Sequence, residues 1–322
     1  MASDSSKVVY AALAGNILVA ATKAVAAVLT GSSGMLSEAV HSFVDTFNEV
    51  LLIYGQHRAR RKPDGDHPLG YGRELYFWSF IVALLIFAVG AGVSAFEGIS
   101  HLRTPHPIDH PVVNYIVLGL SLVFEGTSWT IAMRTIQRTK GDLSYWQAFR
   151  QTKDPPQFMV LLEDSAAIVG IAIALLGTAL SQWTGNPRFD GLASILIAIV
   201  LAVVSAVLAR ESKDLLIGER ADPKMAGDIA QIARHVTGIH GVNGIITSQM
   251  SPDAIIVAMS VEFEDDLRVP EVERIVAELE NQVRQKHPDV VKLFIKPQKC
   301  TTFRDAYQRA TGHSPVADGV RV

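Results

Sequence analysis

The chain has 322 residues, of which 49% are hydrophobic, and its mean hydropathy is +0.25. This hydropathy is typical of a membrane protein, and the formal net charge of −3 gives no reason to expect nucleic-acid binding. The single cysteine, Cys300, excludes a disulfide framework and a cysteine-rich metal site within one chain. Residues 1–7 lack a basic region and a small-residue cleavage site, so we expect no cleaved signal peptide.

Six apolar segments fill the first two thirds of the chain, each near the ~20 residues that a helix needs to cross a bilayer. Glycine and proline residues separate them, and Pro156 suits a first helical turn, where its missing N–H costs nothing. The predicted membrane helices cover approximately residues 10–30, 35–57, 75–99, 112–133, 156–180 and 191–209. We therefore predict an α-helical membrane protein with a six-helix transmembrane domain at residues 1–212.

Lysine and arginine are unevenly distributed among the connections between these segments. The second-to-third and fourth-to-fifth connections hold five basic residues each, whereas the opposite connections hold only Arg103 and Arg188. Basic connections stay in the cytoplasm, so both termini are expected there. We expect an integral membrane protein, located in the inner membrane if the cell is bacterial.

The last third of the chain is charged and has the patterns of a small folded domain. Its predicted elements, in an α-β-β-α-β order, cover residues 223–236, 241–250, 255–264, 270–286 and 290–296. This order is typical of an α+β domain with its helices on one face of a small sheet. We assign this cytoplasmic domain to residues 213–298. Residues 299–322 show no clear periodicity and are expected to form a loosely held tail.

His41 and Asp45 lie one helical turn apart inside the second apolar segment. Ionisable groups are costly in hydrocarbon and usually face a cavity, a partner or an ion. A histidine and a carboxylate four residues apart project from one helix face, and both bind divalent cations. The alternative is a structural hydrogen-bonded pair that joins helices. We favour an intramembrane metal site, and hence a metal transporter, because another segment also carries acidic residues.

A site of this kind needs ligands from a second helix. Asp164 in the fifth segment is the preferred donor, about 12 Å from the cytoplasmic end of its helix at 1.5 Å per residue. Its neighbour Glu163 points in another direction and is an alternative ligand, or one of the two pairs with Lys23. Glu125 in the fourth segment lies at a similar depth. It is a candidate fourth ligand or proton carrier, or a neutral carboxyl group held by a neighbour.

Two further groups of polar residues are weaker candidates. Asn16 and Asn48 are more typical of contacts between helices. Asp64, Asp66 and His67 lie in the basic connection after the second segment and could bind a second ion there. A solvated turn rich in glycine and proline is the favoured interpretation of this connection.

The sequence resembles the cation diffusion facilitator family of metal transporters over nearly its whole length. The resemblance rests on HSFVDTFNEVLL at residues 41–52, HPLGYGRE at residues 67–74, the six segments and the α-β-β-α-β tail. It implies a homodimeric antiporter, and not an enzyme, that exchanges cytoplasmic Zn²⁺ or a related cation for protons. DPPQFMVLLEDSAAIVG and TGNPRFDGLAS are similar to a divergent branch that includes the human mitochondrial zinc transporter.

The resemblance also implies a transport site made of an H/D-x-x-x-D pair in the second span and an H-x-x-x-D pair in the fifth. His41 and Asp45 match the first pair, and Asp164 matches the second carboxylate. Val160 stands where the fifth-span histidine is expected, and an acidic pair replaces the usual motif in the divergent branch. Tyr71 stands where the family's loop often has a histidine.

The expected function is divalent cation efflux, first of all of Zn²⁺, by proton-coupled antiport. His41, Asp45 and Asp164 would hold the cation, completed by Glu163 or Glu125, and protons would compete for these ligands. Three carboxylates and one imidazole form a hard ligand set, which favours Mn²⁺, Fe²⁺ or Co²⁺ as alternatives.

A non-transporting membrane sensor or scaffold is the other class of function that the sequence allows. A membrane metallohydrolase would need an open metal position and a general base, and the sequence offers no such second constellation. No cofactor is expected apart from the transported cation. The expected partners are a second copy of the chain, joined through the tail domain, protons and the lipid bilayer.

Overall fold

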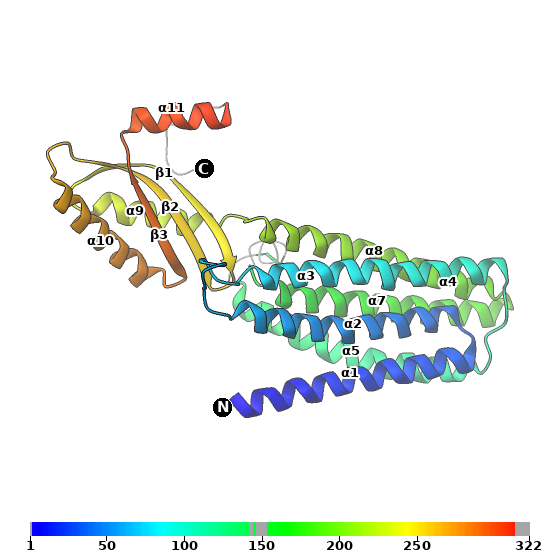
Figure 1. The fold of residues 1–322 in the computed structure, drawn as a ribbon. Helices are drawn as coiled ribbons and strands as arrows, with labels where there is room; N and C mark the ends of the chain where they lie inside the picture. The colour runs from blue at the N-terminus through cyan, green and yellow to red at the C-terminus, as the bar shows by residue number, and fades with distance from the viewer. Residues whose placement is uncertain (1, 142–143, 146–152, 313–322) are drawn as a thin grey trace. The chain divides into compact units, whose positions relative to one another are not determined.

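A computed structural model describes residues 2–141, 144–145 and 153–312 (Figure 1). The chain divides into two compact units, Met1–Lys213 and Asp214–Val322. The described part of the first unit is helical, whereas the second unit combines helices with a three-stranded sheet.

Long helices form the first unit, and each predicted segment coincides with one helical rod. The bounds are α1 (Ala2–Thr30), α2 (Ser33–Ala59), α3 (Glu74–Leu85), η1 (Ile86–Ala91), α4 (Gly92–Arg103), α5 (Pro111–Thr139), α7 (Pro155–Thr184) and α8 (Arg188–Leu216). The elements α3, η1 and α4 follow one another without a break, and η1 is π-helical. This π-helical stretch was not predicted from the sequence, because a hydrophobic pattern does not distinguish π from α turns over six residues.

Within the described residues, four helical rods are long and apolar enough to cross a membrane: Glu74–Arg103, Pro111–Arg138, Pro155–Thr184 and Arg188–Leu216. The described apolar part of the first rod, Gly15–Thr30, is shorter. The α2 helix has a suitable length but carries Glu38, Asp45 and Glu49, which lower its hydropathy. Composition therefore supports a membrane protein, and six crossings stay a proposal.

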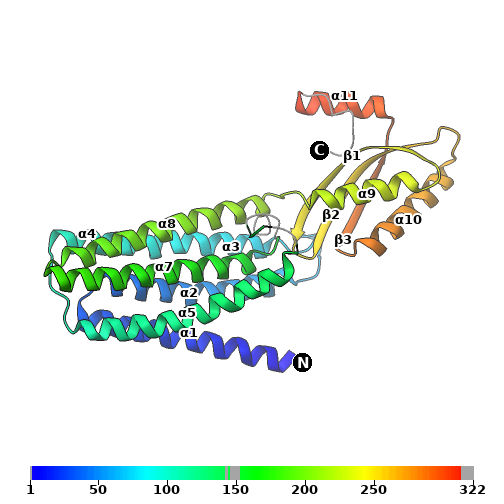
Figure 2. The ribbon, with the colours of Figure 1, turned by 180° about the vertical axis from the view of Figure 1, so that it is seen from behind.

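The α2 helix lies at the centre of the helical unit. It packs against α1, α3, α4 and α7, and these helices run side by side in both views (Figures 1 and 2). Its residues Met35, Val44 and Leu52 belong to the buried apolar core, whereas Phe43 and Phe47 are exposed. Exposed aromatic side chains of this kind are stable in contact with lipid. The polar side chains of α2 therefore face other helices.

Hydrogen bonds close both ends of the helical unit. At the end with the basic connections, the Tyr76 hydroxyl donates to the Lys153 carbonyl at 3.2 Å. At the opposite end, the Asp109 N–H donates to the Thr30 carbonyl at 2.8 Å. The two basic connections therefore share one end of the unit, as expected if that end faces the cytoplasm.

The second unit contains the α-β-β-α-β order that the sequence predicted, followed by one more helix. The bounds are α9 (Pro223–His235), β1 (Ile239–Ser251), β2 (Ala254–Phe263), α10 (Val269–Lys286), β3 (Val290–Pro297) and α11 (Cys300–Thr311). The strand order is β1-β2-β3, with β1 antiparallel and β3 parallel to β2. Val257 and Met259 of β2 pack with Ile229 of α9 and Leu279 of α10 in one buried core.

The prediction of a loosely held tail from residue 299 was wrong for residues 300–311, which form α11. Residues 313–322 lie outside the described part of the chain. The α11 helix places Phe303, Ala306, Tyr307 and Ala310 along a cavity of about 460 Å³ that the sheet also lines. Spacings of three and four residues put these side chains on one helix face. This spacing was the signal that the sequence analysis missed.

We expect Phe303→Ala to loosen α11 locally. A methyl group added at Gly244 would meet the Phe303 ring at 2.6 Å, so the ring lies tightly against β1. Losing these contacts is expected to cost about 1–2 kcal/mol, which is about a 5- to 30-fold change in a local opening equilibrium. Amide hydrogen exchange should therefore accelerate in α11 but not in α9. Val269→Ala, at an exposed position of α10, serves as the control, and unchanged exchange in α11 would contradict the packing described.

Candidate metal site

The structure brings His41 and Asp45 together on α2. The His41 Nε2 and Asp45 Oδ2 atoms lie 3.4 Å apart, and the His41 side chain is 2% exposed. Within the described residues, both His41 ring nitrogens and Asp45 Oδ1 are buried without a hydrogen-bond partner. Buried polar atoms are nearly always paired, so unpaired ones at one place are typical of a site that takes up a ligand.

Glu163 of α7 turns toward α2. Its Oε1 accepts a hydrogen bond from Asn48 Nδ2 at 3.2 Å, and both side chains are buried. Asn48 follows Asp45 by three residues and His41 by seven, so all three lie on one stripe of α2. The Asn48 carbonyl oxygen Oδ1 has no hydrogen-bond partner among the described residues. Asn48 thus joins two helices, as expected, and leaves an acceptor free beside Asp45 and Glu163.

Asp164 turns toward α5 instead. Its Oδ2 accepts from Ser128 Oγ at 2.8 Å, so the two neighbouring carboxylates diverge as the helical spacing predicts. Glu125 precedes Ser128 by three residues on the same helix. Electrostatic interactions nevertheless connect Asp45 with Glu163, Glu125 and Asp164. The acidic groups of three helices therefore share one electrostatic environment.

Lys23 of α1 is fully buried and pairs with Glu38 of α2, at 3.2 Å between Nζ and Oε2. It also donates to Ser42 Oγ at 2.8 Å and lies 4.0 Å from Glu125 Oε1. The alternative in which Lys23 pairs with Glu163 or Asp164 was therefore wrong. Glu38 was missed, although it lies in the same segment, seven residues before Asp45 and hence on the same face.

No complete coordination shell is assembled in the described residues. Within these ranges, no three His, Cys, Asp or Glu side chains are grouped so that they could hold a metal ion. The structure therefore places candidate ligands on the facing helices α2 and α7 without closing them around one point.

The connection between α2 and α3 forms a turn that Asp64 closes with its own side chain. Asp64 Oδ1 accepts the backbone N–H groups of Asp66 and His67, at 3.1 and 2.8 Å, and Oδ2 accepts the Tyr71 hydroxyl at 2.5 Å. The His67 ring lies against the Tyr71 ring with their centroids 4.3 Å apart. These bonds are the ones expected of the favoured solvated turn, and they use both Asp64 oxygens.

Tyr71→Phe is expected to raise the pKa of Asp64. The Tyr71 hydroxyl, followed by the His67 N–H, holds the pKa of Asp64 below its usual value of 3.8. Because the pKa is lowered in the folded state, this carboxylate stabilises the turn above pH 3.8, and the contribution is lost as the pH falls through the folded value. In carboxyl NMR titration of the detergent-solubilised protein, Tyr71→Phe should move the Asp64 midpoint upward. Tyr115→Phe, whose hydroxyl bonds to Gln182, is the control, and an unmoved midpoint in Tyr71→Phe would refute this assignment.

Apolar helices with exposed hydrophobic side chains around buried histidine and carboxylate groups are typical of membrane proteins that bind or transport ions. A family model for the cation efflux transmembrane domain matches residues 9–217, and one for the cation efflux protein cytoplasmic domain matches residues 221–299. The chain therefore belongs to the cation efflux, or cation diffusion facilitator, family, whose members are transporters and not enzymes.

Three relatives illustrate this membership. The mitochondrial proton-coupled zinc antiporter SLC30A9 of Xenopus laevis is 35% identical over 261 residues, 80% of this chain and 46% of the relative. Metal tolerance protein C4 of Arabidopsis thaliana is 29% identical over 269 residues, 82% of this chain and 58% of the relative. The manganese efflux system protein MneP of Bacillus subtilis is 19% identical over 301 residues, 90% of this chain and 95% of the relative. The chain thus spans about half the length of the first two.

Proposed function

We propose that the protein exports divalent cations, first of all Zn²⁺, across a membrane in exchange for protons. The observation that carries this proposal is a group of buried polar atoms on one stripe of α2 that have no hydrogen-bond partner among the described residues: the two His41 ring nitrogens, Asp45 Oδ1 and Asn48 Oδ1. Nitrogen and oxygen atoms of this kind bind Zn²⁺. The name of the Xenopus relative, a proton-coupled zinc antiporter, supports the same cation and the same coupling.

In this proposal His41 and Asp45 provide the ligands from α2, and α7 provides a carboxylate. Glu163 is the first candidate because its hydrogen bond to Asn48 already directs it toward the α2 stripe. Asp164 could replace or join it after giving up its bond to Ser128. Glu125 of α5 is then a proton carrier or a fourth ligand, since it shares the electrostatic environment of Asp45.

Proton coupling follows from the chemistry of these ligands. A cation binds the deprotonated carboxylate and the neutral imidazole, so protons and cation compete for the same atoms. Cytoplasmic cation would bind to the deprotonated site, and protons from the opposite side would displace it once the site opens there. Each transport cycle thus moves cation and protons in opposite directions.

The membrane arrangement belongs to the same proposal. The six rods would each cross the bilayer, with both termini on the cytoplasmic side, because the two basic connections lie at one end of the helical unit. The domain at residues 213–298 would hold two copies of the chain together. Its match to a cytoplasmic domain of cation efflux proteins supports this role.

Mn²⁺ is the second candidate substrate, with Fe²⁺ and Co²⁺ beside it. A site with one imidazole and two or three carboxylates is harder than a site with two imidazoles, and hard ligands suit Mn²⁺. The manganese efflux protein of Bacillus subtilis, which aligns with 90% of this chain, supports this alternative.

A sensor or scaffold without transport is the remaining alternative. It has one observation in its favour, because Glu163, Asp164 and Glu38 each have a polar partner on another helix. A structural network of this kind would join helices without carrying an ion.

The experiment that tests the proposal uses the purified protein in liposomes that contain a pH-sensitive dye and a zinc-sensitive dye. We expect an inward Zn²⁺ gradient to drive Zn²⁺ uptake and simultaneous proton release. Uptake of Mn²⁺ in preference to Zn²⁺ would select the second substrate. Absence of any cation or proton movement would reject transport and leave the scaffold alternative.

A further inference from the structure

Lys23 is a positive charge buried among the acidic groups of the candidate transport pathway. Its side chain is 0% exposed and contacts Glu38 and Ser42 of α2, with Glu125 of α5 at 4.0 Å. The α1 helix packs against both α2 and α5 (Figure 2). The contacts of Lys23 with Glu38, Ser42 and Glu125 therefore connect three helices. A lysine in hydrocarbon is costly unless it is paired, and so its position requires an explanation.

The space for this ion pair is provided by α7. A methyl group added at Gly170 would overlap the Glu38 carboxylate, so a glycine is required where α7 passes this group. Gly170 follows Glu163 and Asp164 by less than two helical turns. The ion pair therefore lies against the same helix that supplies the candidate carboxylates.

The charge of Lys23 also acts on the candidate site itself. Electrostatic interactions connect the Lys23 ammonium with both His41 and Asp45. Ser42, which accepts a hydrogen bond from Lys23, is the residue that follows His41. A cation bound by His41 and Asp45 would therefore experience repulsion from Lys23 and attraction from Glu38.

We propose that Lys23 is a tethered counter-cation of the transport pathway, which holds Glu38 and Glu125 away from the transported ion and weakens its binding. This inference rests on the proposed function. A transported ion must bind tightly enough to enter and weakly enough to leave, and a fixed positive charge beside the site favours release. Glu38 offsets part of the Lys23 charge, so the ion pair determines how much positive charge the transported ion experiences.

The test compares Lys23→Met with Glu38→Gln in the liposome assay, measuring the KM for Zn²⁺ at pH 8. Removing Lys23 leaves the pathway more negative, so KM should fall roughly tenfold, with slower turnover as release becomes limiting. Removing the Glu38 charge leaves Lys23 uncompensated, so KM should rise by a similar factor. The double variant removes both charges and should return KM to near the wild-type value.

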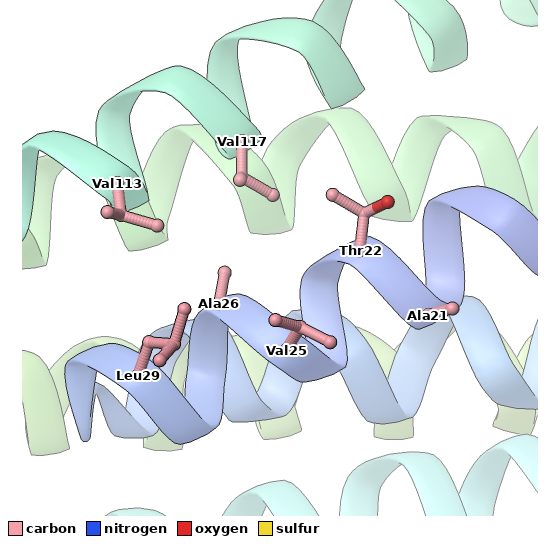
Figure 3. A pocket seen from close by; sticks show the side chains of 7 residues that line it. All are labelled: Ala21, Thr22, Val25, Ala26, Leu29, Val113 and Val117. Atoms are coloured by element: carbon pink, nitrogen blue, oxygen red, sulfur yellow. The ribbon is translucent and has the colours of Figure 1, made fainter.

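Opposite shifts in KM distinguish this role from a structural one. If the pair only held helices together, both single variants would lose the same contact and shift KM in the same direction. Lys23→Arg keeps the charge and should keep a KM near that of the wild type. Thr22→Val changes a neighbouring residue that lines the apolar groove between α1 and α5, and serves as the control (Figure 3).

Two results would overturn the inference. Shifts of KM in the same direction in both single variants, or no shift in either, would show that Lys23 does not set cation affinity. The double variant removes the charge imbalance that could prevent a single variant from folding, so a KM far from wild type in that folded protein would count equally against the inference. If the wild-type protein moves no cation, the proposed function itself fails, which the wild-type assay shows independently of any variant.

Discussion

Asp45→Asn is expected to abolish cation-driven proton exchange, with a loss of roughly 100-fold or more, because even indirect partners of metal ligands contribute 10- to 100-fold. Asparagine has the same shape but lacks the negative charge that a divalent cation requires. Asp45 is central to the acidic group, since it lies 3.4 Å from His41 and interacts with the carboxylates of α5 and α7.

The measurement is Zn²⁺ uptake with proton release in liposomes, normalised to the amount of folded protein. Asp66→Asn makes the same chemical change at an exposed position of the α2–α3 connection and should retain full activity. The closest contact described for the Asp45 side chain is the 3.4 Å approach of His41 Nε2, and asparagine keeps the shape of the side chain, so stability should change little. Transport by Asp45→Asn at the wild-type rate would remove this residue from the site.

Asp190→Ala is expected to have the largest effect on stability. Asp190 is fully buried in the first turn of α8 and accepts hydrogen bonds from Ser32 Oγ at 2.7 Å and from the Ser33 N–H at 2.5 Å. It also faces the N-terminus of α2, where a negative charge is favourable. Alanine would leave these donors buried without their acceptor.

The expected cost is about 3 kcal/mol, since buried donors lose a charged partner. For a unit of this size the Tm should fall by about 6–12 °C. Thermal unfolding in detergent, followed by the fluorescence of the native tryptophans, measures the difference. Asp109→Ala is the control, because Asp109 is exposed at the same end of the unit. A Tm within about 1 °C of the wild type in Asp190→Ala would mean that the α2 cap contributes little.

Local patterns in the sequence were sufficient to locate the described helices and strands other than α11 and the π-helical η1. The apolar segments coincide with the helical rods, and the predicted strand at 255–264 compares with Ala254–Phe263 in the structure. Spacings of three and four residues were equally sufficient to place His41 and Asp45 on one face. These features depend on neighbouring residues, whose geometry a helix or strand determines.

Contacts between distant residues could not be predicted in the same way. Asn48 and Glu163 are 115 residues apart, and Ser33 and Asp190 are 157 apart, so neither pair has a local signal. Asp164 was preferred to Glu163 from the sequence, although the two neighbours lie at nearly the same depth and differ in the direction in which they point. The direction in which each carboxylate points depends on how α7 is rotated against α2 and α5. The hydrogen bonds of Glu163 to Asn48 and of Asp164 to Ser128 reveal this rotation.

The partner of Lys23 illustrates the same limit. A buried lysine predicts an acidic partner but does not say which of the seven acidic residues in the apolar segments it pairs with. Packing of α1 against α2, together with the space left by Gly170, brings Glu38 to it. Helix packing, and not the spacing of residues in the sequence, therefore determines which acidic residue pairs with Lys23.

A cation held between α2 and α7 is the central feature of the proposed function. A crystal structure of the protein soaked with Zn²⁺, with anomalous data collected at the zinc absorption edge, locates that cation. We predict an anomalous peak between His41, Asp45 and the carboxylate of Glu163 or Asp164, which is lost in Asp45→Asn. Zinc found only at the α2–α3 connection or in the second unit, with no peak beside His41 and Asp45, would contradict a transport site between α2 and α7.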